Sequence, residues 1–292
     1  MLRSSATRSA VASLAAAALT VLAASCGGGD DPEPPDDPPE SLLRQAAANP
    51  PRSGDAAIGV DLALEGNSLL AGASALRLDG PFSLDPDGGL PAFDFGMDAE
   101  LAGFGVDGSL VSTGEDAFVV FFGENYRVGP ERTADLENEL ATALAANGGG
   151  LMFDEWIRDA RYEDVEEVGG VDAVRIVGVA NPEAAVRDLG ALAGSLGLPS
   201  GVLRTARVAG GPAEAWVGLE DWVLRRIRVQ LAFEVPAALR ARAGEISAGT
   251  LALDAEVSDV GAEVTVKPPP GGGFQPIEDL IDRIGSLAGL AL

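Results

Sequence analysis

The chain has 292 residues, 47% of them hydrophobic, and a formal net charge of −25. So acidic a surface repels phosphate backbones, which excludes nucleic acid and other polyanions as partners. There is no histidine and Cys26 is the only cysteine, which excludes Ser-His-Asp and Cys-His catalysis, histidine zinc sites and an internal disulfide. Carboxylate pairs such as Glu155 with Asp159 remain open, but we predict no enzymatic activity and no cofactor or metal.

The N-terminal residues form a secretory signal of the lipoprotein kind. Arg3 and Arg8 precede an apolar run over 10–22, and the small residues 23–25 lead to Cys26. This run is too short to span a bilayer, which needs about 20 residues. We expect cleavage before Cys26 and lipid attachment to it, which makes the body extracytoplasmic and lipid-anchored to the cell membrane. A plain signal peptide or a membrane-spanning helix with a chance cysteine is the alternative.

An acidic, proline-rich segment follows the signal. Residues 30–40 contain six acidic residues and five prolines, a composition that cannot bury a core and stays extended. A short helix is expected over 41–48, ended by Asn49-Pro50-Pro51. We interpret the segment as a spacer between membrane and body. A calcium site is the alternative interpretation of its acids, but disorder fixes no ligand geometry.

Alternating apolar and polar residues predict strands over much of the remaining chain. The clearest case is 93–101, where odd positions are apolar and even positions are acidic or glycine. Successive strand side chains point to opposite faces, so each such strand has one apolar face. The run 118–122 is apolar throughout, as in a strand covered on both faces. Short connections predict antiparallel pairing, with turn signals at 85–89, 113–116 and 210–212.

Helices interrupt the strands. The apolar spacing predicts one helix over 133–147 and another that begins at Asn181-Pro182, where proline suits the first helical position. A shorter helical piece is expected over 152–157, and Pro276 opens a last helix.

These patterns predict about nine to eleven strands with one apolar face each, and few helices to cover them. A sheet of this size tends to curl. We therefore predict an α+β fold, a large curved antiparallel sheet or half-open β-barrel with a few helices closing the concave face. The sequence is compatible with two kinds of interior. One is a hollow lined by apolar side chains, and the other is an ordinary packed sandwich.

Four segments carry diffuse hydrophobic and glycine patterns: 76–82, 112–126, 168–178 and 215–218. Together with the lipid-accepting cysteine and the acidic spacer, they resemble the LppX/LprAFG lipoproteins of actinobacteria, which are similar in fold to LolA carriers. The resemblance extends over residues 55–267. It rests on no catalytic signature, and no ligand motif of that family matches this chain.

The resemblance implies a hydrophobic cavity for the acyl chains of envelope lipids or lipoglycans, which the protein would carry or chaperone. It also implies a membrane transporter as a candidate partner, beside the membrane itself. The lining would come from the cavity-facing strand positions, which are Ile58, Val60, Leu62, Leu76, Leu78, Phe93, Phe95, Met97, Val106, Leu110, Phe118, Val120, Val174, Ile176, Trp216, Ile227, Val229, Leu231, Phe233, Leu251, Leu253 and Val257.

The expected organisation has four parts. They are a lipoprotein signal peptide over 1–25, the lipidated cysteine with its acidic tether and short helix over 26–52, a lipid-binding half-barrel over 53–267, and a Pro/Gly linker with a C-terminal helix over 268–292.

Two further alternatives concern the surface. The acidity disfavours anionic headgroups unless a local basic patch exists, formed by Arg204, Arg207, Arg225, Arg226 and Arg228; arginines paired with nearby acids are the alternative. The competing function is a non-enzymatic envelope scaffold or sensor that binds a protein partner, with anchors among Trp156, Trp216 and Trp222 unless these pack in the core.

Overall fold

The structure is a computed structural model that describes residues 33–66, 72–84, 89–101, 104–135, 137–138, 153–195, 206–243 and 245–287. A compact unit extends from Pro34 to Leu292. The predicted signal peptide, Cys26, Arg204, most of the turn at 85–89 and most of the helix at 133–147 lie outside the described residues. The described start of that helix is at 130, three residues before the predicted one.

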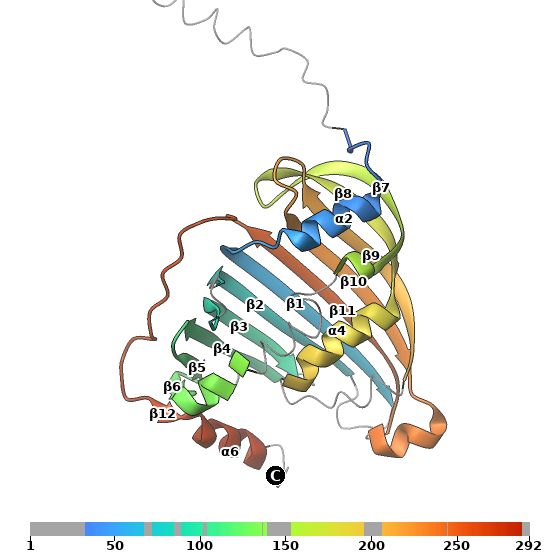
Figure 1. Ribbon diagram of the computed structural model, residues 1–292. Helices are drawn as coiled ribbons and strands as arrows, with labels where there is room; N and C mark the ends of the chain where they lie inside the picture. Colours follow the sequence, from blue (N-terminus) through green and yellow to red (C-terminus); the bar gives the residue numbers. More distant parts are fainter. Residues whose placement is uncertain are drawn as a thin grey trace, which may run out of the picture. The chain divides into compact units, whose positions relative to one another are not determined.

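One twelve-stranded sheet dominates the described part of the chain, in the order β12-β6-β5-β4-β3-β2-β1-β11-β10-β9-β8-β7. Neighbouring strands are antiparallel except for the parallel pair β12 and β6. The sheet curves around two helices (Figure 1), which confirms the predicted α+β class and the large curved antiparallel sheet. The strands are β1 (Ser53–Gly66), β2 (Gly72–Ser83), β3 (Ala92–Leu101), β4 (Phe104–Thr113), β5 (Ala117–Phe121), β6 (Glu124–Arg127), β7 (Ile157–Val168), β8 (Val171–Ala180), β9 (Arg207–Gly218), β10 (Leu224–Glu234), β11 (Ile246–Ser258) and β12 (Gln275–Pro276).

Two antiparallel meanders, β1–β6 and β7–β11, meet where β1 pairs with β11. In that register Ile58 lies opposite Ala255, and Val60 lies opposite Leu253. Both strands alternate apolar and polar residues, so this pairing places the apolar positions of both on one face. The apolar face is therefore continuous from one meander into the other.

Two helices pack on that face over strands β7–β10. They are α2 (Pro39–Ala48) and α4 (Pro182–Ser195), and Figure 1 shows both on the same side of the sheet. Leu42 and Leu43 of α2 and Ala185 of α4 are buried in one core cluster with side chains of β8, β9 and β10. The short helix that was grouped with the tether thus contributes to the main core.

The helix α4 begins at the predicted residue. Pro182 occupies its first position, and the carbonyl of Asn181 accepts a hydrogen bond from the backbone N–H of Ala185 at 3.1 Å. Proline lacks the N–H that would have no partner at this position, so the start costs nothing. The expected helical piece at 152–157 is the short 3₁₀ helix η1 (Phe153–Glu155), which leads directly into β7.

The predicted turn at 210–212 is wrong, because these residues lie inside β9. The register of β9 against β10 shifts between Val229 and Leu231, which marks a β-bulge. A Cβ atom on Gly210 would lie 1.8 Å from the carbonyl oxygen of Ala180. Glycine is needed here because the end of β8 approaches the bulged backbone closely, and the bulge also tolerates Pro212.

Strand β7 was not expected, because charged residues interrupt its apolar pattern. It is the edge strand, with two register shifts against β8, and Asp159 has a positive φ of 54°. Charges and bulges on an edge strand disfavour pairing with another chain. The charged residues that obscured the strand pattern of β7 in the sequence therefore also disfavour edge-to-edge association of the sheet.

The C-terminal arm covers the opposite edge. It comprises β12 and the helix α6 (Ile277–Leu287), which confirms the helix expected near Pro276. Ile277 and Leu280 pack on the buried Tyr126 of β6. The Glu124 carboxylate accepts hydrogen bonds from the Tyr126 hydroxyl and from Arg283, both at 2.7 Å. A second 3₁₀ helix, η2 (Ala237–Ala243), connects β10 with β11.

The burial of α2 predicts a stability effect. Leu43 has no exposed surface, so Leu43→Ala leaves a cavity and should lower the free energy of unfolding by about 2–5 kcal/mol in urea titrations. Arg44→Ala is the control, because this side chain is exposed and should change stability by only about 0.5 kcal/mol. Equal effects of both substitutions would contradict the place of α2 in the core.

Candidate functional site

The candidate site is the inner face of the sheet, which we define as the face covered by α2 and α4. Its positions follow from the register, since directly opposite residues share a face. One row across six strands is apolar throughout and consists of Val229, Leu253, Val60, Leu76, Ala99 and Val106. The alternation in the sequence thus produces a wide apolar surface on one side.

Burial along the inner face is uneven. On β8 and β10 the predicted lining positions are at most 6% exposed and pack in the protein's own core; they are Val174, Ile176, Ile227, Val229, Leu231 and Phe233. On β11 and β1–β4 the predicted positions remain partly exposed; they are Ile58, Val60, Leu62, Leu76, Leu78, Phe93, Phe95, Met97, Val106, Leu110, Leu251, Leu253 and Val257. The second set offers apolar surface that another molecule can contact.

Three predicted lining residues are on the wrong face. Phe118 lies opposite Val111 and Val120 lies opposite Ser109, and both partners alternate with the inner positions of β4. Phe118 instead packs on Phe274, with ring centroids 4.9 Å apart. Trp216 lies opposite Arg226, next to the inner position Ala215. These three residues belong to the outer face and cannot line the inner one.

The sequence interpretation also missed inner positions. Val119 and Phe121 face inward on β5, because they lie opposite Leu110 and Gly108, which are inner positions of β4. A uniformly apolar strand carries no alternation from which to choose a face. A turn placed at 122–123 pairs the polar Asn125 with Val120, and that pairing was the available signal. Leu64 is a further inner residue, which packs near Phe233.

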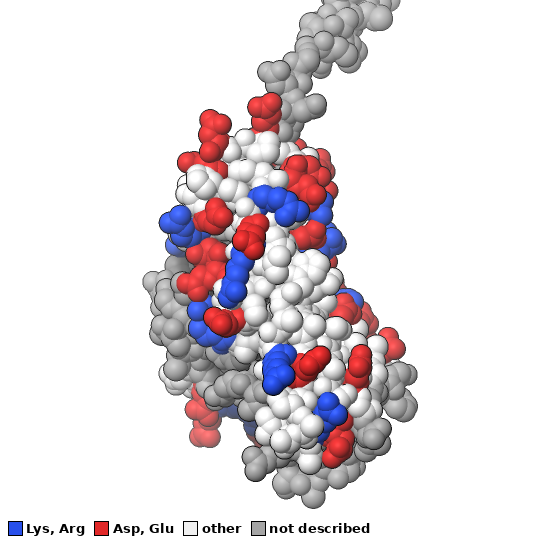
Figure 2. All heavy atoms as spheres, turned by 90° about the vertical axis from the view of Figure 1, so that its right-hand side faces the viewer, with Lys and Arg blue, Asp and Glu red and all other residues white. Residues whose placement is uncertain are grey.

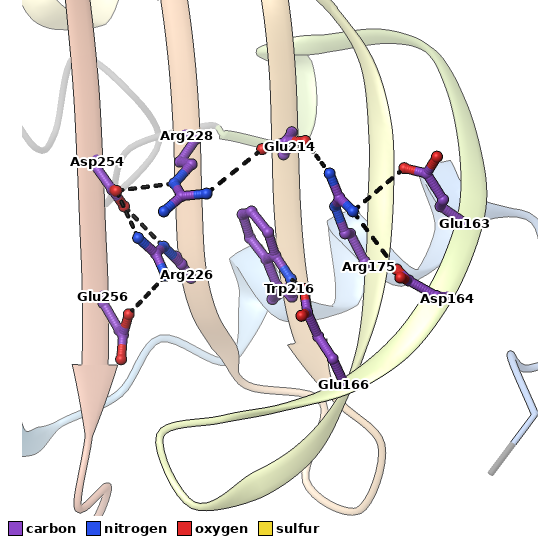
Figure 3. A network of polar contacts seen from close by, with 10 residues as sticks. All are labelled: Glu163, Asp164, Glu166, Arg175, Glu214, Trp216, Arg226, Arg228, Asp254 and Glu256. Carbon is purple, nitrogen blue, oxygen red and sulfur yellow. Dashed lines mark hydrogen bonds and ion pairs between the residues drawn. The ribbon is translucent and has the colours of Figure 1, made fainter. Parts of the chain in front are cut away.

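The outer face carries a network of arginines and acids around Trp216 (Figure 3). The guanidinium carbons of Arg175, Arg226 and Arg228 lie 5.4–5.6 Å from the centroid of the indole ring, within the range of cation–π attraction. Trp216 is only 3% exposed, and its indole N–H donates to Glu166. The arginines therefore cover a large aromatic ring on the outer face.

Acidic partners neutralise these arginines. Asp254 accepts hydrogen bonds from Arg226 at 2.6 Å and 2.9 Å and from Arg228 at 2.8 Å, while Arg175 bonds to Glu214. Figure 2 shows charged residues of both signs interspersed on the side of the molecule it presents. Together with the Arg225–Asp221 ion pair, this confirms the paired alternative for three of the five arginines proposed as a basic patch.

The other two tryptophans also serve the core. Trp156 is 1% exposed and donates from its indole nitrogen to Asp188 at 2.8 Å. Trp222 is partly buried against the main cluster. The tryptophans therefore pack within the protein, which was the alternative to their acting as interface anchors. The carboxylate candidate Glu155 is paired with Arg187 at 2.9 Å.

Two negative findings concern the described residues alone. None of the helices described there combines the length and apolarity needed to cross a membrane. The same part of the chain brings together no group of three or more acidic side chains that could hold a metal ion.

Comparison with known proteins finds similarity in solved structures. No family model matches the chain, and no curated protein matches it. LprF from Mycobacterium bovis is similar over 80% of this chain and 97% of its own, with 15% identity and a TM-score of 0.43. The lipoprotein LppX from Mycobacterium tuberculosis is similar over 78% of this chain and 97% of its own, with 14% identity and a TM-score of 0.40. Both belong to the group that the sequence resembles, and a likeness at this level carries over no ligand.

The outer network predicts acid sensitivity. Burial by itself raises the pKa of Asp254, but hydrogen bonds from Arg226 and Arg228 outweigh it and hold the pKa below its usual value. A lowered pKa stabilises the fold above the unfolded value near 4, and this stability is lost as pH falls further. Between pH 7 and pH 3 the wild type should lose about 0.5–1 kcal/mol more unfolding free energy than Asp254→Asn, because this partly exposed pair is screened by water.

The exposed Glu245→Gln serves as the control, and it should follow the wild type over the same pH range. Identical pH profiles for Asp254→Asn and the wild type would contradict the role of the network.

Proposed function

We propose that the chain is an extracytoplasmic lipoprotein, anchored through Cys26, that binds acyl chains of envelope lipids or lipoglycans and carries or chaperones them. The observation that supports this proposal is the partly exposed apolar surface on the inner face of β11 and β1–β4. The protein would recognise the hydrocarbon part of its ligand. Its role would be binding, without catalysis.

The energetics of such binding favour a long apolar tail. Burying one methylene group contributes about 0.8 kcal/mol, so a chain of about 16 carbons gains on the order of 10 kcal/mol before the entropic costs of binding. A surface of Leu, Ile, Val, Phe and Met side chains provides this gain without precise polar contacts. It therefore suits a carrier that accepts several related lipids.

The proposed organisation keeps the signal at 1–25, the anchor and tether at 26–52, the binding domain at 53–267 and the C-terminal segment at 268–292. Because α2 packs into the core, the tether would end before Pro39. The body would then stay close to the membrane, where a transporter can deliver or accept the lipid. A protein-binding scaffold has less support, since Trp156 and Trp216 are buried.

Lipid should remain bound to the protein during purification. Native mass spectrometry of the full chain extracted from bacterial membranes is expected to show a species heavier than the lipidated protein by the mass of a bound lipid. A spectrum with the ligand-free mass alone, together with no uptake of a fluorescent fatty acyl probe, would refute the proposal.

Matched substitutions on the two faces of the same strands locate the binding surface. Val60→Asn and Leu76→Asn put an amide on the inner face, which should cost about 1–3 kcal/mol against hydrocarbon and weaken acyl-probe binding about 5- to 150-fold. The controls Ala57→Asn and Ala75→Asn change the outer face of β1 and β2 and should leave binding unchanged. Equal losses in both pairs would place the ligand elsewhere.

A further inference from the structure

A pocket of about 400 Å³ lies at one end of the sheet, where β9 begins and β10 continues into η2. Its wall combines arginine, carboxylate, hydroxyl and apolar side chains, the mixture expected where a charged group meets an apolar one. The residues that form it are Arg207, Glu234, Val235, Pro236, Ala237, Arg240, Ser247 and Ala248.

Both arginines of the pocket have free donors. Among the described residues, Arg207 has no hydrogen-bond or ion-pair partner, and Arg240 donates only from Nε, to the carbonyl oxygen of Val235 at 3.2 Å. In contrast, the arginines around Trp216 are all paired with acids. Unused N–H donors on two guanidinium groups of one pocket suit anionic oxygen atoms.

The charge of the pocket selects the kind of anion. Glu234 lies directly opposite Arg207 in the β9–β10 register, yet the two form no ion pair with each other in the described structure. Two guanidinium groups and one carboxylate give the pocket a net charge of about +1. This charge matches a monoanion, such as a phosphodiester, better than a dianion such as a phosphate monoester.

The pocket and the inner face share one end of the sheet. Arg207 and Glu234 alternate with the inner pair Val208 and Phe233, so their side chains belong to the outer face. Val235 forms part of its wall and is also buried in a cluster with Phe233 and Ile246. Leu62 and Leu64 of the inner face pack against that cluster. The pocket therefore lies at the end of the sheet where the apolar surface of β1 stops.

We propose that this pocket binds a monoanionic phosphodiester, with Arg207 and Arg240 donating to its non-bridging oxygens. As the headgroup of a bound lipid, the phosphodiester deepens the proposed function and rests on it. A free, water-soluble phosphodiester is the other source of the same chemistry, and the pocket can bind it whether or not the inner face binds lipid.

The test compares three probes that separate the headgroup from the acyl chains. Dioleoylphosphatidylglycerol and dioleoylglycerol differ in the phosphodiester headgroup, and glycerophosphoglycerol presents that headgroup without acyl chains. The full chain is titrated with each probe, as wild type and as the double variant Arg207→Gln/Arg240→Gln. Because charge-assisted hydrogen bonds are strong, the variant should lose about tenfold or more in affinity for dioleoylphosphatidylglycerol and keep its affinity for dioleoylglycerol.

Arg52→Gln/Arg161→Gln is the matched control, since it removes the same charge from two exposed arginines that do not line the pocket. The proposal expects this control to bind like the wild type. Equal losses in the two double variants would indicate a general charge effect and would overturn it, as would no loss in either. Glu234→Gln should strengthen binding of the phosphodiester probes severalfold, because it removes the one negative charge of the pocket.

The probes separate the two proposals. Arginine-dependent binding of glycerophosphoglycerol without binding of either dioleoyl probe supports the pocket and refutes the acyl-binding function. Equal binding of the two dioleoyl probes, with none of glycerophosphoglycerol, supports the acyl-binding function and overturns the pocket.

Discussion

The imbalance between apolar sheet surface and its helical cover is the constraint on which the architecture depends. The register places apolar side chains on the inner face from β10 through β11 and β1 to β4. Leu42 and Leu43 of α2, with Ala185 of α4, complete a dry core over β8–β10. Beyond that region, positions such as Val60 and Leu76 keep part of their surface exposed. Partly exposed apolar side chains side by side on five strands favour association with another apolar molecule, which is the physical basis of the proposed acyl binding.

The outer face has the opposite chemistry, and this difference between the faces directs a ligand to one side. Trp216 is buried beneath Arg175, Arg226 and Arg228, whose charges are balanced by acids such as Asp254. The ring is thus hidden from any ligand, while the arginines use their donors within the protein. Arg207 and Arg240 depart from this pattern, because their donors remain available in a pocket at the end of the sheet. A lipid with an acidic headgroup would meet apolar surface on the inner face and free guanidinium groups at the same end of the sheet.

Local alternation predicted the sheet and most of its faces. The run from Phe93 to Ala99 points its odd positions inward, as its pattern indicates, and Pro182 marks the start of α4. The failures have identifiable physical causes. The strand containing Phe118 is apolar on both faces, so which of its residues point inward depends on its hairpin pairing. Trp216 was assigned to the inner face, although Ala215 and Val217 on either side of it occupy the inner positions. The contribution of α2 to the core is a contact between segments far apart in the chain, which no local pattern specifies.

Photo-crosslinking with a diazirine-bearing fatty acid tests the central claim most directly, because the reactive carbon labels whatever side chain the hydrocarbon touches. The account predicts labelled peptides from β11 and β1–β4, concentrated at inner positions such as Val60, Leu76 and Leu253 and competed by unlabelled lipid. Labelling confined to outer-face residues, or no labelling that unlabelled lipid suppresses, would contradict it.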